Sequence, residues 1–164
     1  MNRVSVIYHS ETGNTQKMAE LICEGILAGG CEAKIMSVDD LDREYIKESK
    51  AVLFGSPTYY GTMSWKMKRL MDTFPVKLEG KLGAPFASAA WKGGGGYELT
   101  EIALISGMLI RGMMIYSGGV VTGMPPTHFG AVSAASPEGF DADRCIKLGR
   151  NIGFKVNELW PVHI

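Results

Sequence analysis

The stretch VSVIYHSETGNT, residues 4–15, joins an apolar segment to a polar turn and decides the fold. Its first five residues are mostly β-branched or aromatic, as in a strand, and the polar residues after them include Gly13, as in a turn. From Asn14 or Thr15 onward apolar residues recur at helical spacing, and Gly29-Gly30 ends the pattern. The stretch therefore predicts a strand that leads through a turn into a helix.

The same alternation continues along the chain. We predict strands at 4–8, 31–36, 51–54, 84–91 and 113–121, the last with an irregularity at Gly118-Gly119, and helices at 14–28, 41–47, 65–74, 97–110 and 141–159. Strands that alternate with helices form a parallel sheet covered on both faces. The sequence therefore predicts an α/β fold. Residues 122–140 form a connection too long and too rich in Pro, Gly and Ser for an ordinary loop, which favours a functional role.

Composition narrows the class of protein. With 164 residues, 46% of them hydrophobic, residues 1–164 are expected to form one domain. The 17 basic and 17 acidic side chains cancel without long runs, which disfavours nucleic-acid and acidic-lipid partners. The three cysteines lack metal or redox spacing, so we expect reduced thiols, no metal site and a cytoplasmic location. The N-terminal sequence is not typical of a signal peptide, and no apolar stretch predicts membrane insertion.

The hexapeptide Ser10-Glu11-Thr12-Gly13-Asn14-Thr15 carries the strongest functional signal. It precedes a predicted helix, where unpaired backbone N–H groups and the helix dipole stabilise a phosphate. Ser10, Thr12 and Thr15 add hydroxyl donors, and Gly13 lets the amides converge. The loop lacks the lysine of a triphosphate-binding loop and the Gly-x-Gly-x-x-Gly of a dinucleotide-binding turn, which favours a monophosphate. The alternative is a Ser/Thr-rich turn that only caps a helix.

Three segments resemble known flavoproteins. Residues 8–20 (YHSETGNTQKMAE) resemble the FMN phosphate loop and first helix of flavodoxins, whereas residues 55–64 (GSPTYYGTMS) and 91–98 (WKGGGGYE) resemble WrbA-type NAD(P)H:quinone oxidoreductases. The resemblance in element order spans nearly the whole chain. It implies a flavodoxin-like three-layer αβα sandwich with a five-stranded parallel sheet in the order 2-1-3-4-5. FMN would bind outside the carboxyl ends of strands one and three.

The resemblance also implies which residues contact FMN. The phosphate would be held by Ser10, Thr12, Gly13, Asn14 and Thr15. The isoalloxazine ring would be faced by Pro57, Thr58, Tyr59, Tyr60 and Gly61. Backbone amides near the N1 and O2 edge of the ring would come from Lys92, Gly93, Gly94 and Gly95, and Trp91 would either stack near the ring or belong to the core. Aromatic flanks suit a flat ring, and close backbone N–H groups stabilise the charge of reduced flavin. The alternatives are an ordinary turn at Pro57 and a merely flexible glycine loop.

His128 lies in the long late connection, and we keep two interpretations of it open. It is either a proton donor to a quinone or a contact for the flavin edge, or else a solvated loop histidine. No other side chain is predicted to be catalytic, because the flavin performs the chemistry.

The resemblance implies an FMN-dependent oxidoreductase that passes electrons from NADH or NADPH to a quinone or other small acceptor. The chain is shorter than WrbA-like enzymes, and electron-carrier flavodoxins are strongly acidic around the flavin, whereas this chain is neutral. The alternatives are a flavodoxin-type electron carrier and a flavin-binding regulatory or scaffolding protein. Glycine loops and methionine-rich helices further predict a homodimer or homotetramer.

Overall fold

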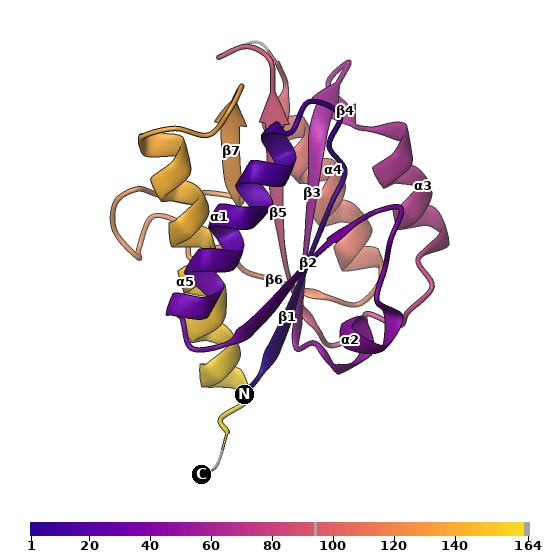
Figure 1. Cartoon of the computed structure of the whole chain (residues 1–164), viewed down its shortest axis with the longest axis vertical. Coiled ribbons are helices and arrows are strands. Elements are labelled where there is room, and N and C mark those ends of the chain that lie inside the picture. The colour runs from indigo at the N-terminus through magenta and orange to yellow at the C-terminus, as the bar shows by residue number, and fades with distance from the viewer. Residues whose placement is uncertain (94, 163–164) are drawn as a thin grey trace.

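Figure 1 shows a computed structural model of the chain, which describes residues 1–93 and 95–162. The strands are β1 (Arg3–Tyr8), β2 (Glu32–Ser37), β3 (Ala51–Tyr59), β4 (Thr62–Met63), β5 (Leu82–Ala89), β6 (Met114–Ile115) and β7 (Ala131–Ala134). The helices are α1 (Asn14–Ala28), α2 (Arg43–Glu48), α3 (Trp65–Thr73), α4 (Tyr97–Ile110) and α5 (Phe140–Leu159). Ser64 caps α3, its hydroxyl accepting a hydrogen bond from the N–H of Met67.

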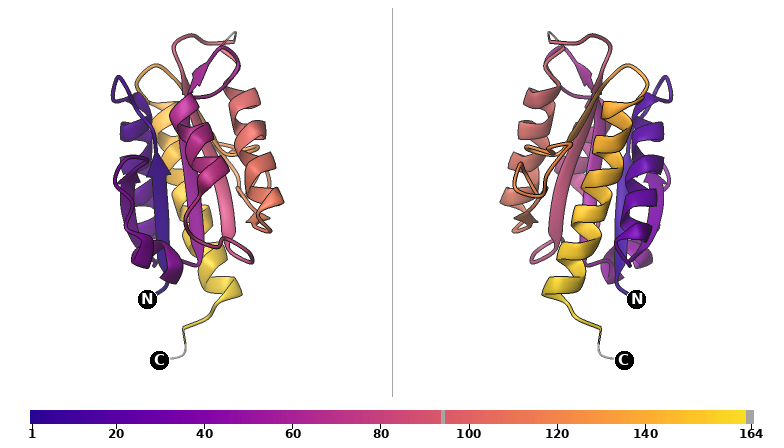
Figure 2. Two further views of the ribbon diagram at one scale, coloured as in Figure 1. Left: turned by 90° about the vertical axis from the view of Figure 1, so that its right-hand side faces the viewer. Right: turned by 90° about the vertical axis from the view of Figure 1, so that its left-hand side faces the viewer.

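The sheet has the order β2-β1-β3-β5-β6, and every pair along this path is parallel. The predicted α/β sandwich and strand order are therefore confirmed. Two short strands add to the predicted five: β4 pairs antiparallel with β3, and β7 pairs parallel with β5. Figure 2 shows the sheet between two layers of helices, with α1 and α5 on one face and α3 and α4 on the other.

The strand at the β6/β7 edge of the sheet differs from the predicted one in its extent and continuity. The strand predicted at 113–121 is wrong beyond Ile115, and the connection predicted at 122–140 contains β7. The chain leaves the sheet because Gly118 and Gly119 both have positive φ, which breaks an extended strand. It returns at Ala131, so β6 pairs with the start of β5 and β7 with its end. Two strands, β6 and β7, thus share one edge position of the sheet, and residues 116–130 between them leave the sheet as a loop, which we call the excursion.

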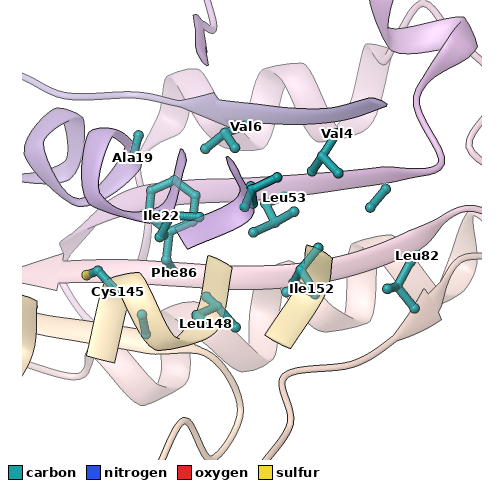
Figure 3. Packing of buried hydrophobic residues seen from close by; sticks show 14 of the residues in the cluster. Val4, Val6, Ala19, Ile22, Leu53, Leu82, Phe86, Cys145, Leu148 and Ile152 are labelled. Carbon is teal, nitrogen blue, oxygen red and sulfur yellow. The ribbon is translucent and has the colours of Figure 1, made fainter. Parts of the chain in front are cut away.

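Two apolar cores fix the layers. Figure 3 shows the first, in which Val6, Leu53 and Phe86 of the sheet pack with Ile22 of α1 and Leu148 of α5. The second core lies on the other face of the sheet, where buried residues of α2, α3 and α4 pack against β1 and β3. Because the central strands are covered on both faces, they are apolar in continuous runs rather than in alternation.

The carboxyl ends of β1, β3 and β5 meet at one edge of the sheet, which lies at the top of Figure 1. The backbone N–H of His9 extends the β1–β3 ladder by donating to the carbonyl of Gly55 at 3.0 Å. The loops after Tyr8, Tyr59 and Ala89 therefore emerge side by side. No helix formed by the described residues is long and apolar enough to span a membrane.

Candidate functional site: a phosphate cradle and two outer loops

The N-terminus of α1 lies at the carboxyl ends of the strands, where the loops after β1, β3 and β5 meet. Gly13 precedes the helix with φ of 91°, and no side chain caps the helix. The first helical hydrogen bond runs from the N–H of Lys17 to the carbonyl of Gly13 at 3.0 Å. Within residues 1–93 and 95–162, no acceptor is present for the N–H groups of Asn14, Thr15 and Gln16. Such convergent, unpaired donors at a positive helix end fit a phosphate group.

These donors border a cavity of about 210 Å³ at the three strand ends. The residues that line it are Ser10, Glu11, Thr12, Asn14, Thr15, Pro57, Thr58, Tyr59, Ser88, Ala89 and Ala90. The structure thus brings together four residues predicted to hold phosphate and three predicted to face a flat ring. Gly13 contributes its turn rather than the cavity wall.

We call residues 10–16, the turn and the first amides of α1, the phosphate cradle. Hydroxyl groups tie this cradle to the sheet. The Thr15 and Ser88 hydroxyls are hydrogen-bonded at 2.8 Å, and both residues are buried. The N–H of Gly13 donates to the Ser10 hydroxyl at 3.0 Å. Ser88 was not predicted as a site residue, although the small residues Ser88-Ala89-Ala90 at the end of a predicted strand could have indicated space for a ligand.

His9 is a second residue that the sequence analysis missed. Its side chain is buried, with Nδ1 2.8 Å from the Ser64 hydroxyl and Nε2 2.9 Å from a Glu11 carboxylate oxygen. Ser64 in turn caps α3 and donates its N–H to the Ser56 hydroxyl at 2.9 Å. His9 therefore connects the phosphate cradle to β3 and α3, and its position directly after the first strand was the available signal.

The loop after β3 forms a tight hairpin beside the cradle. Tyr60 and Gly61 connect β3 to β4 and have φ of 50° and 79°, the positive values that a two-residue type I′ turn requires. Tyr60 is fully exposed, whereas Tyr59 lines the cavity. Partial burial and the nearby Glu11 carboxylate raise the pKa of Tyr59. The hairpin thus places the phenol ring of Tyr59 at the cavity and exposes that of Tyr60 to solvent.

The α4 helix supports the hairpin from below. The hydroxyl of Thr100 donates to the Thr58 hydroxyl at 3.0 Å. A Cβ atom on Gly96 would lie 3.1 Å from the Cα of Gly61, so glycine permits this close approach of two loops.

The glycine loop after β5 lies on the outside of the molecule. Lys92 and Gly93 are exposed, and Gly93 has φ of 71°. Gly95 contacts the end of β5, because a Cβ atom there would be 2.6 Å from that of Ala89. Gly94 lies outside the described residues. Trp91 is 77% exposed, so the alternative that it belongs to the core is wrong.

His128 lies elsewhere. It is exposed and lines a different cavity, together with Tyr97, Phe129 and Arg144, and not the cavity at Ser10. Its carbonyl accepts a hydrogen bond from the Ser117 hydroxyl, which fixes the backbone of the excursion rather than the imidazole. Its suggested roles toward flavin or quinone stay predictions.

Comparison with known proteins identifies the family. The model of the Flavodoxin family matches residues 6–102. The chain belongs to the flavodoxin family. This flavodoxin-family chain is 36% identical over 160 residues to a protein named flavodoxin from Clostridium saccharobutylicum, which covers 96% of this chain and 99% of the relative. Family membership makes the chain a flavoprotein.

Two further likenesses bear out the mixed resemblance of the sequence. A protein of Archaeoglobus fulgidus named NAD(P)H dehydrogenase (quinone) is 29% identical to this flavodoxin-family chain over 190 residues, with 93% of the chain and 96% of the relative covered. A WrbA-like flavodoxin structure from Agrobacterium tumefaciens shares the fold at a TM-score of 0.81 and 22% identity, with 96% of the chain and 99% of that structure covered. The resemblance to flavodoxins with WrbA-like features is therefore confirmed.

Proposed function

We propose that the chain binds FMN at the cradle and serves as an oxidoreductase between NADH or NADPH and a quinone or other small acceptor. The observation that carries the proposal is the set of unpaired N–H groups at Asn14, Thr15 and Gln16, next to a cavity that the aromatic ring of Tyr59 lines. A single cradle with no lysine suits one phosphate group, as in FMN.

Different residues would hold the phosphate and the ring of the cofactor. Bound FMN would supply the chemistry, accepting a hydride and releasing electrons to the acceptor. The α1 amides and the Ser10 and Thr12 side chains bind and orient the phosphate, and His9 fixes Glu11 beside it. Tyr59, Tyr60 and Trp91 would offer flat faces, and the backbone amides of Lys92, Gly93 and Gly95 in the outer loop would approach the ring edge.

The balanced charge of the chain favours an enzyme over an electron carrier. The chain carries 17 basic and 17 acidic side chains, without the excess negative charge that steers a carrier to a basic partner. The full-length similarity to a quinone dehydrogenase also supports the enzyme. The electron carrier is the second candidate, because the relative from Clostridium saccharobutylicum is named flavodoxin and is similar over 99% of its length.

The deciding experiment follows visible absorbance of the FMN-loaded protein as NADH or NADPH is added without oxygen. Bleaching by either nucleotide, followed by recovery with a soluble quinone, is expected for the enzyme. A protein that binds FMN and stays yellow with both nucleotides would exclude the enzyme and favour the carrier. A protein that binds no FMN would overturn the proposal as a whole.

A charge placed in the cradle tests the site itself. Thr12 is exposed, so Thr12→Asp is expected to fold normally and to weaken FMN binding by about tenfold or more, since two like charges a few ångströms apart repel. Thr73→Asp at the exposed end of α3 is the matched control and should leave the affinity unchanged. Fluorescence quenching of FMN measures both, and equal affinities in the two variants would contradict the assigned phosphate site.

We extend the proposal to self-association and location. Leu99, Ile102, Leu109 and Ile110 are exposed on one stripe of α4 that carries no charge, and a second copy of the chain would bury it. Cys23, Cys31 and Cys145 are free thiols, which supports a cytoplasmic location.

A further inference from the structure

A second cavity, of about 610 Å³, lies along the β7 edge of the sheet. Glu101 of α4 and Arg144 of α5 both line it, although these helices cover opposite faces of the sheet (Figure 2). Val132 of β7 and Val120 and Phe129 of the excursion supply apolar walls. The cavity shares no lining residue with the phosphate cradle, so it is a separate site.

Glu101 is a buried carboxyl group without a partner. The residue is 2% exposed, and no hydrogen-bond partner for its Oε1 atom exists in the part of the chain that is described. Glycine is required at Gly130 beside it, because a Cβ atom there would overlap the Pro85 carbonyl oxygen and lie 2.7 Å from Oε1. Burial, together with the neighbouring charge of Glu98, raises the pKa of Glu101 to about 9, although Arg144 opposes the rise. At neutral pH Glu101 is therefore protonated and has an O–H to donate.

Arg144 is the complementary group. Its Nε atom is also buried without a hydrogen-bond partner among the described residues. Its guanidinium lies over the Phe140 ring, 5.0 Å from the centroid, which orients the group without satisfying its donors. No ion pair joins Arg144 to Glu101, so each of these two residues that line the cavity keeps a buried polar atom without a partner among the described residues.

We propose that this cavity binds a compact organic monocarboxylate, whose oxygens accept hydrogen bonds from the Arg144 guanidinium and the Glu101 carboxyl group and whose apolar body lies against Val120, Phe129 and Val132. The Arg144 Nε–H group is a donor in either state of Glu101, and the Glu101 carboxyl donates when it is protonated, so a ligand acceptor satisfies both groups. A negative charge on it is stabilised by Arg144, because a charge-assisted hydrogen bond is stronger than a neutral one. An inorganic anion fits less well, because the walls are apolar and the cavity is larger than such an ion needs.

The test uses 2-naphthoate as the probe and the neutral 2-naphthamide as its control, titrated into the FMN-loaded protein by calorimetry. Saturable binding of the acid, at least about tenfold tighter than binding of the amide, is expected. R144M and E101L are each expected to weaken naphthoate binding by about tenfold. The exposed Arg150 of the same helix provides the control R150M, which should bind as the unchanged protein does. E101Q keeps a donor and should retain most of the affinity.

The pH dependence separates binding at Glu101 from binding elsewhere. Naphthoate affinity of the unchanged protein should fall by about tenfold per pH unit above about pH 9, where Glu101 loses its proton, and E101Q should lack this decrease. The remaining titratable groups that line the cavity are Tyr97, Glu98, His128 and Arg144. His128→Gln should leave the alkaline decrease in place, whereas Glu98→Gln should keep the decrease but move it to lower pH, because the Glu98 charge helps to raise the pKa of Glu101.

Three results would overturn the proposal. They are the absence of saturable naphthoate binding, equal binding in the R144M and R150M variants, and displacement of FMN by naphthoate, which would put the probe in the cradle. Thermal unfolding of each variant shows whether a loss of binding comes from loss of the fold, and E101Q supports the assignment if R144M unfolds. Since the calorimetric readout does not depend on turnover, failure of the proposed oxidoreductase activity leaves this test intact.

Discussion

Tyr60 holds a backbone conformation that ordinarily belongs to glycine or asparagine. Its φ of 50° costs an L-residue roughly 1 kcal/mol, and its fully exposed ring gains no packing in return. A residue that destabilises the chain without packing is typical of a functional site. We expect Tyr60→Gly to raise the free energy of unfolding of the FMN-free protein by up to about 1 kcal/mol and to weaken FMN binding.

Denaturant unfolding and FMN titration measure the two effects of Tyr60→Gly separately. The matched control is Tyr116→Phe, which does not line the cavity at the cradle and should leave FMN affinity unchanged. A glycine variant that binds FMN as tightly as the unchanged protein would remove Tyr60 from the proposed ring site.

Glu101 makes stability depend on pH with a definite sign. Its pKa is raised from 4.5 in the unfolded chain to about 9, so the folded state holds a proton that the unfolded state releases in this window. The free energy of unfolding therefore falls as pH rises from 4.5 toward 9, by at most about 1.4 kcal/mol per unit. Glu101→Gln should remove this loss, and its advantage over the unchanged protein should grow by at least about 1 kcal/mol between pH 5 and 8.

Urea unfolding at both pH values measures the pH effect at Glu101. Glu24→Gln changes an exposed carboxylate on α1 and should show no such widening. A constant difference between the Glu101→Gln variant and the unchanged protein would mean that the carboxyl is ionised in the folded state.

At the level of single residues, the sequence predicts site residues that lie together in one continuous segment. Ser10, Thr12 and Asn14 were predicted because a phosphate cradle is one continuous turn, and they line the cavity. Ser88 and His9 escaped because their roles depend on contacts across the chain, to Thr15 and Ser64. The hydrophobic periodicity of a sequence does not show that folding brings the Ser88 hydroxyl within 2.8 Å of the Thr15 hydroxyl.

Glycines allow the backbones of the α1 and α5 helices to approach each other closely. A Cβ atom on Gly149 would overlap the backbone carbonyl of Ile22, and one on Gly25 would overlap that of Ile146. Glycine-to-alanine changes in a helix usually stabilise it by roughly 0.5–1 kcal/mol. Here the sign should reverse, because backbone atoms cannot move aside without separating the helices. Gly149→Ala is expected to lower the free energy of unfolding by about 2 kcal/mol or more.

Chemical denaturation compares Gly149→Ala with Arg150→Ala, the next residue on the same helix, which is exposed and should change stability by less than about 0.5 kcal/mol. A stabilised Gly149→Ala variant would mean that the two helices tolerate a wider separation.

Most elements could be predicted from the sequence because periodicity and capping are local. The predicted range of α4 agrees with the structure, and that of α5 differs by one residue. The edge strand could not be predicted, because Met113–Val121 is apolar enough for a strand and its exit from the sheet depends on distant contacts. Buried Asn151 of α5 donates to the Ser117 carbonyl and the Thr122 hydroxyl, and these bonds hold the excursion off the sheet.

For the whole molecule, the distribution of apolar surface separates the two helical layers. Helix α4 is apolar on almost every side, although only one side packs against the sheet, and Ile110 at its end is 88% exposed. On the opposite layer, Leu27 is the one large apolar side chain of α1 that is exposed. Single exposed apolar residues are ordinary, whereas a continuous apolar stripe favours an interface.

We therefore expect a homodimer at micromolar concentration that Ile110→Glu converts to a monomer, since two charges would be buried at a symmetric interface. The variant should fold, because its side chain is exposed in the single chain. Leu27→Glu introduces the same charge on the other layer and should leave the dimer intact. Light scattering of the FMN-loaded proteins measures both. A monomeric unchanged protein would refute the interface, and dissociation by Leu27→Glu alone would move it to the α1 layer.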